Sequence, residues 1–240
     1  MELNTVEKNL KKIYDDWKLG NEKENNGYSA MFRMGFPDEY IDSDRPLLMY
    51  VGQEDLNGNS YKTQEWVRKY QMVQCAENND ILPEENVRRS PFWDFYRKFG
   101  DMGYNSLWNN LDKFLYADHK THLSSDDATS LSAAYGLERL SVLQREIKLL
   151  KPSVIMLVIG PRKKYRVSLA SAFSVNEKAL TKYKPTIKNC VNDVSDILGL
   201  KNTIALWTYH PNYLRRRGLE NIALNEIKQL IDTSVSDQYT

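Results

Sequence analysis

The stretch Val154-Ile155-Met156-Leu157-Val158-Ile159 is an unbroken apolar run, and Gly160-Pro161 follows it directly. A run this uniformly apolar predicts a strand that is buried on both faces, because a strand with one face in water alternates apolar and polar residues. Such strands occupy central positions in parallel sheets that helices cover on both sides. The run therefore predicts an α/β fold and places this segment near the middle of its sheet.

The segments on either side of this run alternate between helical and extended patterns. Apolar residues recur at helical spacing before it, up to the stop at Lys151-Pro152. We expect helices over 131–150, between 176 and 198 with an interruption near Pro185, and over 219–231, with a further strand over 203–208. Strands that alternate with helices in this way are typical of a parallel sheet.

The first half of the chain adds two strands and three helices to this prediction. We expect strands over 46–51 and 106–111, and helices over 6–19, over 63–76 and from Ser90-Pro91 onward, where serine caps and proline takes the first helical position. The expected fold class is a three-layer α/β/α arrangement around a central, mostly parallel, four-stranded sheet.

Composition fits one globular domain. Of the 240 residues, 41% are hydrophobic and 27% are charged, so the chain can bury a sizeable core. We divide the domain into a helix and irregular lead-in (1–45), a motif-bearing core (46–217) and a C-terminal helix and tail (218–240). A charged start and the lack of a long apolar run predict a soluble, cytoplasmic protein without a membrane partner, and we expect a monomer.

Charge and cysteine content restrict the partners and cofactors. The net charge of +1 is no broad signature of nucleic-acid binding, although basic residues gather at Arg88-Arg89, 162–166 and 215–217. Cys75 and Cys190 cannot form a metal site by themselves, so we expect no metal. Glycine-rich dinucleotide and phosphate-binding loops, a nucleophile elbow and a zinc-protease helix are all missing from the sequence, which argues against those enzyme classes.

Polar residues follow three of the predicted strands at the point where each strand ends. Gly52-Gln53-Glu54-Asp55 follows the first, Asn109-Asn110 the second and His210 the last. The carboxyl ends of parallel strands meet at one edge of a sheet, where ligands bind. A carboxylate there can orient or deprotonate water, an amide can read a base edge, and a neutral imidazole can stabilise a departing anion. The sequence therefore predicts a hydrolytic site at this edge.

These residues, in this order, resemble the motifs of the uracil-DNA glycosylase superfamily. The first motif is Gly52-Gln53-Glu54-Asp55, the second is Asn110 within Asn110-Leu111-Asp112-Lys113, and the last is His210-Pro211-Asn212-Tyr213-Leu214-Arg215. The segment 149–160 is also similar to the third strand of that superfamily and its preceding helix. The resemblance covers 46–217, and the set of motifs is more specific than any one of them.

The resemblance implies a monofunctional DNA glycosylase that hydrolyses the N-glycosidic bond of a flipped-out pyrimidine and leaves an abasic site, with DNA as partner and no cofactor. It implies catalytic roles for Glu54 or Asp55 and His210; base-binding roles for Gln53, Phe92, Trp93, Asn109 and Asn110; and DNA contacts by Gly52, Lys113, Asn212, Tyr213, Leu214, Arg215, Arg216 and Arg217. Tyr213 and Leu214 are the expected wedge that fills the gap in the duplex, and Arg215 to Arg217 the expected phosphate contacts. Phe92 and Trp93 are alternatives for stacking on the base, and both also fit core positions.

The departures from the superfamily pattern bear on the substrate. Asp55-Leu56-Asn57-Gly58 stands where the uracil-specific branch has a proline and a tyrosine that excludes 5-substituents. We therefore expect uracil or a cytosine with a bulky 5-substituent, such as a glucosylated base of phage DNA, in repair or in antiviral defence. The four cysteines of the iron-sulfur branches are missing, so no cluster is expected.

Two other classes of function remain open at this stage. One is a catalytically silent nucleic-acid-binding protein on the same scaffold. The other is an unrelated α/β hydrolase that acts on a nucleoside or small glycoside through Glu54 and Asp55. Salt dependence separates a DNA enzyme from a small-molecule hydrolase, because binding to DNA weakens steeply as salt rises.

Overall fold

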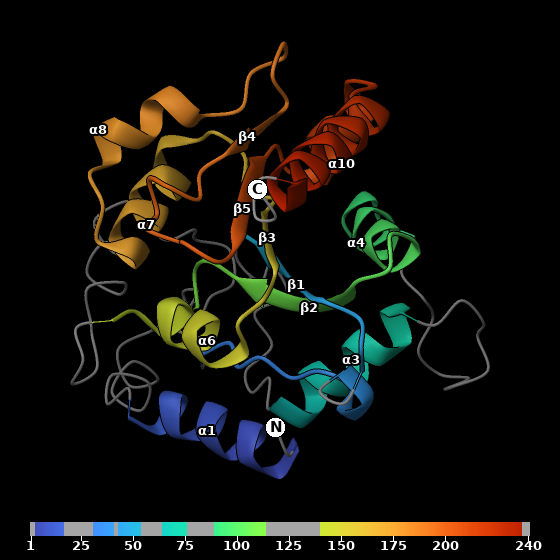
Figure 1. Ribbon diagram of the computed structural model, residues 1–240, viewed down its shortest axis with the longest axis vertical. Helices are drawn as coiled ribbons and strands as arrows, with labels where there is room; N and C mark the ends of the chain where they lie inside the picture. The colour runs from blue at the N-terminus through green and yellow to red at the C-terminus, as the bar shows by residue number, and fades with distance from the viewer. Residues whose placement is uncertain are drawn as a thin grey trace, which may run out of the picture.

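A five-stranded sheet forms the centre of the computed structural model, which describes residues 3–16, 31–40, 43–53, 64–75, 89–113 and 140–236. The strands lie in the order β2-β1-β3-β5-β4, and all neighbours are parallel except β4 and β5. Their bounds are Leu47–Gly52 (β1), Asn105–Asn110 (β2), Val154–Leu157 (β3), Val191–Asp193 (β4) and Ile204–Thr208 (β5). Helices flank the sheet on both sides (Figure 1), which confirms the predicted three-layer α/β/α class.

The central position predicted for the apolar run is confirmed. β3 lies between β1 and β5, with Leu48 opposite Val154 and Val154 opposite Ile204. All of its side chains are buried, and Val158 and Ile159 beyond its end are also buried. A strand with neighbours on both edges and helices on both faces has no exposed surface, which is why its sequence does not alternate.

Local capping explains where the best-defined helices begin and end. Ser90 accepts a hydrogen bond from the Trp93 amide, and Pro91 opens α4 (Pro91–Asp101), as predicted. Ser141 and Gln144 form a capping box at the start of α6 (Val142–Leu150), which ends before Pro152. The other helices are α1 (Leu3–Asp15), α3 (Gln64–Cys75), α7 (Lys163–Phe173), α8 (Glu177–Leu180), α9 (Pro211–Arg216) and α10 (Glu220–Ser236), with short 3-10 turns at Asp38–Tyr40 (η1) and Thr181–Tyr183 (η2).

The helix predicted between 176 and 198 is wrong, and the sheet has one strand more than expected. Only α8 and η2 are helical there, since Pro185 supplies no backbone donor and disfavours helix before it. The chain then pairs β4 antiparallel with β5, with Val191 opposite Thr208. The helix α7 was not predicted, because its first turn falls in a basic cluster that looks like a loop.

The N-terminal segment packs against the side of the sheet that α6 covers. Val6, Leu10 and Tyr14 of α1 are buried, and the Phe32 amide donates to the Lys113 carbonyl at 2.7 Å. Among the described residues, no helix is long and apolar enough to cross a membrane. The strand order reverses between β1 and β3, and such a reversal opens a crevice beyond the carboxyl ends of the strands.

Candidate functional site

Four residues that the sequence singled out meet at this carboxyl edge. Gly52 and Asn110 are register partners at the ends of β1 and β2. A Cβ atom on Gly52 would lie 3.0 Å from Asn110 Oδ1 and 3.1 Å from the Phe92 ring, so the missing side chain leaves room for both. The Phe92 ring stacks on His210, with centroids 5.8 Å apart and planes inclined by 25°. Residues from β1, β2, α4 and the end of β5 thus form one continuous cluster.

Gln53 lies at the base of this cluster and bridges the segments that follow β1 and β3. Its Nε2 donates to the Ile159 carbonyl at 2.7 Å, which joins the segments that follow the two strands. Gly160 turns the chain at a positive φ of 71°, and a Cβ there would lie 3.6 Å from the His210 amide nitrogen. The side-chain amide of Gln53, expected to bind a base, is therefore engaged at least in part with the protein backbone.

His210 is held as a neutral hydrogen-bond donor. It caps α9, and its Nδ1 accepts a hydrogen bond from the Asn212 amide at 3.2 Å. Burial, together with the charge of Arg216, lowers the pKa of His210 from 6.5 to about 4. The neutral ring with Nδ1 as acceptor carries its proton on Nε2. Nε2 makes no hydrogen bond within the described part of the chain, so it can donate to a ligand.

Asn110 also presents an unused donor. Only 2% of this residue is exposed, and its Nδ2 has no hydrogen-bond partner among the described residues. A buried amide without a partner costs free energy unless a ligand or water satisfies it. The unsatisfied Nδ2 therefore indicates a group that binds a ligand acceptor.

Asn109, the other candidate amide on this strand, is committed to a different role. It points to the opposite face of the sheet, and its Nδ2 donates to Glu146 Oε2 at 2.9 Å. Its Oδ1 accepts from the Asn110 amide at 2.8 Å and from Lys113 Nζ. Asn109 has no exposed surface, so its predicted contact with a base does not fit the structure.

Lys113 is likewise buried, which corrects the expectation that it contacts DNA. Only 8% of the residue is exposed, and Nζ donates to both carboxylate oxygens of Glu146, at 3.0 and 2.9 Å. Burial lowers the pKa of Lys113, although the Glu146 carboxylate opposes this effect. Tyr14 donates to Glu146 Oε1 at 2.7 Å and accepts from the Met34 amide. This buried network ties the N-terminal segment and α6 to the end of β2.

Phe92 and Trp93, the two aromatic candidates of α4, lie in different surroundings. Phe92 is partly buried beside His210, and its carbonyl accepts from Tyr50 Oη at 3.1 Å. Trp93 is 5% exposed and packs edge-on against Tyr70 and Trp108. Trp93 is thus a core residue, and Phe92 is the one that faces the cluster.

The expected wedge lies on α9, and only one of its two residues reaches the surface. Leu214 has no exposed surface, so in this structure it cannot enter a duplex. The Tyr213 ring is partly buried, stacks on Tyr209 with centroids 4.5 Å apart, and has the Arg217 guanidinium 5.6 Å from its centroid. A helix that begins at Pro211 turns position 214 inward, which explains why a wedge at Leu214 does not fit.

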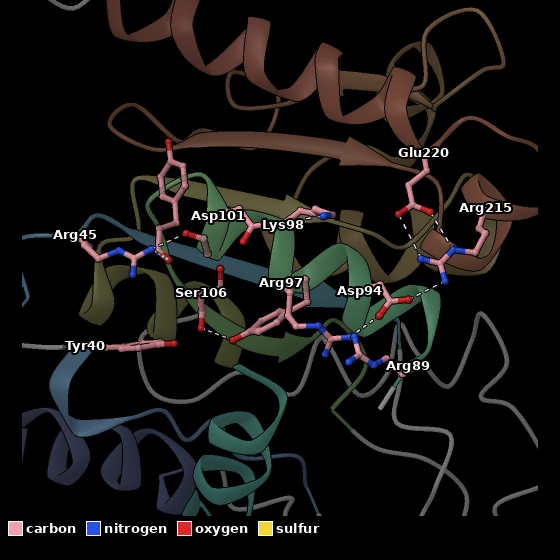
Figure 2. A pocket seen from close by; sticks show the side chains of 13 residues that line it. Tyr40, Arg45, Arg89, Asp94, Arg97, Lys98, Asp101, Ser106, Arg215 and Glu220 are labelled. Atoms are coloured by element: carbon pink, nitrogen blue, oxygen red, sulfur yellow. Dashed lines mark hydrogen bonds and ion pairs between the residues drawn. The ribbon is translucent and has the colours of Figure 1, made fainter. Parts of the chain in front are cut away.

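Arg215 belongs to a charged network at a cavity of about 730 Å³ that is lined mainly by α4, with Arg45, Arg215 and Glu220 among the other lining residues. Figure 2 shows its guanidinium between Asp94 and Glu220, with Nη1 2.8 Å from Asp94 Oδ2 and Nε 3.1 Å from Glu220 Oε2. Burial would raise the pKa of Asp94, but hydrogen bonds from Arg215 and Arg97 outweigh it and hold that pKa low. Arg215 therefore links three helices, and all three arginines, Arg215 to Arg217, are exposed. Asn212 is exposed at the start of α9.

Two of the predicted catalytic carboxylates lie where the structure gives no description, and one buried network was not predicted. Glu54 and Asp55, the predicted water-orienting carboxylates, lie outside the described residues. The network around Glu146 was missed, although the sequence carries a signal for it. Glu146 falls on the apolar stripe of α6 formed by Leu143, Ile147 and Leu150, where a carboxylate is buried and needs partners.

Comparison with known protein families finds no family that matches the chain, and comparison with curated proteins finds no match either. The function is therefore inferred from the geometry and chemistry of the site itself.

Proposed function

We propose that the protein is a DNA glycosylase that hydrolyses the N-glycosidic bond of a pyrimidine flipped out of DNA. The observation that carries this proposal is the convergence of two unused donors, Asn110 Nδ2 and His210 Nε2, around Gly52 and Phe92. A pyrimidine offers carbonyl acceptors on its edge and a flat face for an aromatic ring. Asn110 would read the edge, and Phe92 would contact the face.

The chemistry follows from the charge that develops on the base. When the bond between C1′ and the ring nitrogen breaks, its electron pair leaves with the base, whose carbonyl oxygen becomes negative. The neutral His210 Nε2–H can donate to that oxygen without the cost of adding a proton to a group whose pKa is about 4. Water adds to C1′ and gives its proton to Glu54 or Asp55, as the sequence predicts, and an abasic site remains.

The crevice supports a broad rather than a narrow substrate range. Gly52 has no side chain beside Asn110 and Phe92, and Asp55-Leu56-Asn57-Gly58 stands where the uracil-specific branch has the proline and tyrosine that exclude a 5-substituent. Uracil and 5-modified cytosines, including glucosylated ones, are therefore the candidate substrates, in repair or in antiviral defence. The alternative is a nucleic-acid-binding protein without catalysis, which would use the same crevice to hold a base.

Alkali cleavage after incubation with defined duplexes tests the proposal. Duplexes that carry uracil, 5-hydroxymethylcytosine or its glucosylated form should break at the modified position. His210→Ala should slow breakage by about a hundredfold and retain DNA binding, whereas His119→Ala, at a histidine without an assigned role, should behave like the wild type. Binding without breakage on every duplex would favour the non-catalytic alternative. Hydrolysis of free nucleosides without salt-dependent DNA binding would favour the small-molecule hydrolase.

A further inference from the structure

A tight turn before β4 presents an isolated apolar side chain to solvent. Ile187 is 60% exposed, more than any other large apolar residue in the described part of the chain. The Thr186 amide donates to the Asn189 carbonyl at 2.9 Å, and the Asn189 amide donates to Thr186 Oγ1 at 3.1 Å. Pro185 and Cys190, on either side of this turn, are buried. These hydrogen bonds and buried residues therefore fix the turn that carries Ile187, the apolar tip.

The turn lies on the same edge of the sheet as His210. β4 runs antiparallel to β5, so its first residue, Val191, pairs with Thr208 at the carboxyl end of β5. Thr208 Oγ1 donates to the Cys190 carbonyl at 2.8 Å, which fixes the base of the turn to that strand. In Figure 1 the orange loop before β4 projects from the top of the molecule. Ile187 thus projects beyond the edge at which the candidate site opens.

Within the segment that carries Ile187, all charged side chains are basic, while Glu226 of α10 accepts a hydrogen bond from the Val191 amide at 2.8 Å. The segment 181–190 contains Lys182, Lys184 and Lys188 and no acidic residue, and all three lysines are exposed. Within the described residues none of them forms an ion pair. Exposed lysines that surround an apolar tip complement a polyanion with an apolar interior, as a nucleic-acid duplex has between its base steps.

We propose that Ile187 inserts into duplex DNA beside the nucleotide held at His210, while Lys184 and Lys188 contact the flanking phosphates. Isoleucine is one of the apolar residues that proteins insert between base steps, and a flipped nucleotide leaves a gap that such a residue can fill. Leu214, the residue that the sequence predicts to fill this gap, has no exposed surface. Insertion into the duplex therefore requires a different residue. This inference rests on the proposed function, because it requires a duplex at the site.

Fluorescence of 2-aminopurine next to a tetrahydrofuran abasic analogue in a duplex measures insertion without knowledge of the excised base. Wild-type protein should raise the fluorescence. Ile187→Ala should lose most of this rise and bind the duplex about tenfold more weakly, while its melting temperature stays that of the wild type. Ile222→Ala is the matched control, because Ile222 is also an exposed isoleucine, at 48%, and lies on α10 rather than in the turn before β4.

A second measurement tests the lysines. Lys184→Gln and Lys188→Gln should each make the dependence of log affinity on log salt concentration shallower by about one unit. With a cleavable base, Ile187→Ala should slow excision from duplex DNA by about tenfold and leave excision from single strands unchanged, because a single strand has no stack to open.

The possible results separate this inference from the proposed function. A fluorescence rise that depends on Ile187, without excision of any base, would support insertion and contradict the glycosylase assignment. Excision by Ile187→Ala at the wild-type rate, with an unchanged fluorescence rise, would overturn insertion alone. No binding of any duplex by the wild type would overturn both. A changed oligomeric state in Ile187→Ala, with DNA binding unaltered, would assign the tip to a contact between copies and also overturn insertion.

Discussion

The imidazole of His210 stacks on the ring of Phe92, with centroids 5.8 Å apart and planes inclined by 25°. These two residues stand at the starts of α9 and α4, and the ion pair between Arg215 and Asp94 joins the same two helices at 2.8 Å. The ring pair is thus fixed by a second contact further along both helices. Because Arg215 also binds Glu220, the position of His210 depends on α10 as well.

His210 should act in catalysis as a neutral hydrogen-bond donor to the departing base. His210→Ala should lower the rate of base excision by about a hundredfold, because it removes a donor from the developing anion. The wild-type rate should show no inflection near pH 6.5 that is due to His210, since its pKa is about 4. Single-turnover excision rates between pH 4 and 8 measure this. A wild-type rate that falls as His210 is deprotonated near pH 6.5 would show that the protonated form is the active one.

The same pKa predicts a pH-dependent contribution to stability. Between about pH 6.5 and about pH 4 the unfolded state binds a proton on His210 that the folded state does not bind, so acid favours unfolding in this window. The free energy of unfolding of the wild type should therefore fall relative to that of His210→Gln as the pH decreases from 6.5 to 4. Arg216→Gln should raise the pKa of His210 and narrow the window, which an NMR titration of the imidazole can follow. An unchanged pKa in Arg216→Gln would leave burial as its sole cause.

The central architecture and three strand-end residues could be predicted because local patterns determine them. The apolar runs of β1, β3 and β5 require buried parallel strands, and the topology of such a sheet brings their carboxyl ends together. Gly52 and Asn110 end their strands, and His210 lies two residues after the end of β5, so their convergence follows without knowledge of any long-range contact.

The remaining features depend on packing that a local pattern does not contain. β4 is short and polar, and only pairing with β5 makes it a strand. Phe92 and Trp93 are adjacent aromatic residues, and the way α4 docks decides which one faces the site. Lys113 looks like an exposed base-contacting residue until Glu146, far away in the sequence, is placed beside it.

Asn110 should be more important for function than for stability. Asn110→Ala removes a donor that is unsatisfied in the protein, so we expect a loss of about tenfold or more in kcat/KM for base excision and little loss of stability. Asn105→Ala is the matched control, because Asn105 lies at the other end of β2, is 4% exposed and also has an Nδ2 without a partner among the described residues. Excision kinetics and chemical denaturation of both variants provide the comparison. Equal losses of activity in the two variants would remove Asn110 from the site.

Gly52 should tolerate no side chain in an active protein. The added methyl of Gly52→Ala would lie 3.0 Å from Asn110 Oδ1 and 3.1 Å from the Phe92 ring, so these residues must shift. We expect a destabilisation of about 1–3 kcal/mol together with a marked rise in KM. Gly100→Ala, in the exposed last turn of α4 where nothing lies within 4 Å, should keep full activity and gain slightly in stability. Excision assays with wild-type KM in Gly52→Ala would mean that the ligand does not occupy this space.

The buried pair of Lys113 and Glu146 should be a strong determinant of stability. Lys113→Met removes the cation that faces Glu146, which has no exposed side-chain surface, and among the described residues leaves its carboxylate with only the Tyr14 and Asn109 donors. We expect a loss of about 3–5 kcal/mol in the free energy of unfolding, measured by urea denaturation. Lys69→Met breaks an exposed pair with Glu65 and should cost at most about 1 kcal/mol. The double variant Lys113→Met/Glu146→Gln should be more stable than Lys113→Met alone, because it no longer buries an unpaired charge. A loss in the free energy of unfolding that is no larger for Lys113→Met than for Lys69→Met would show that the network does not hold the end of β2. Asn110 would then be positioned by the sheet alone.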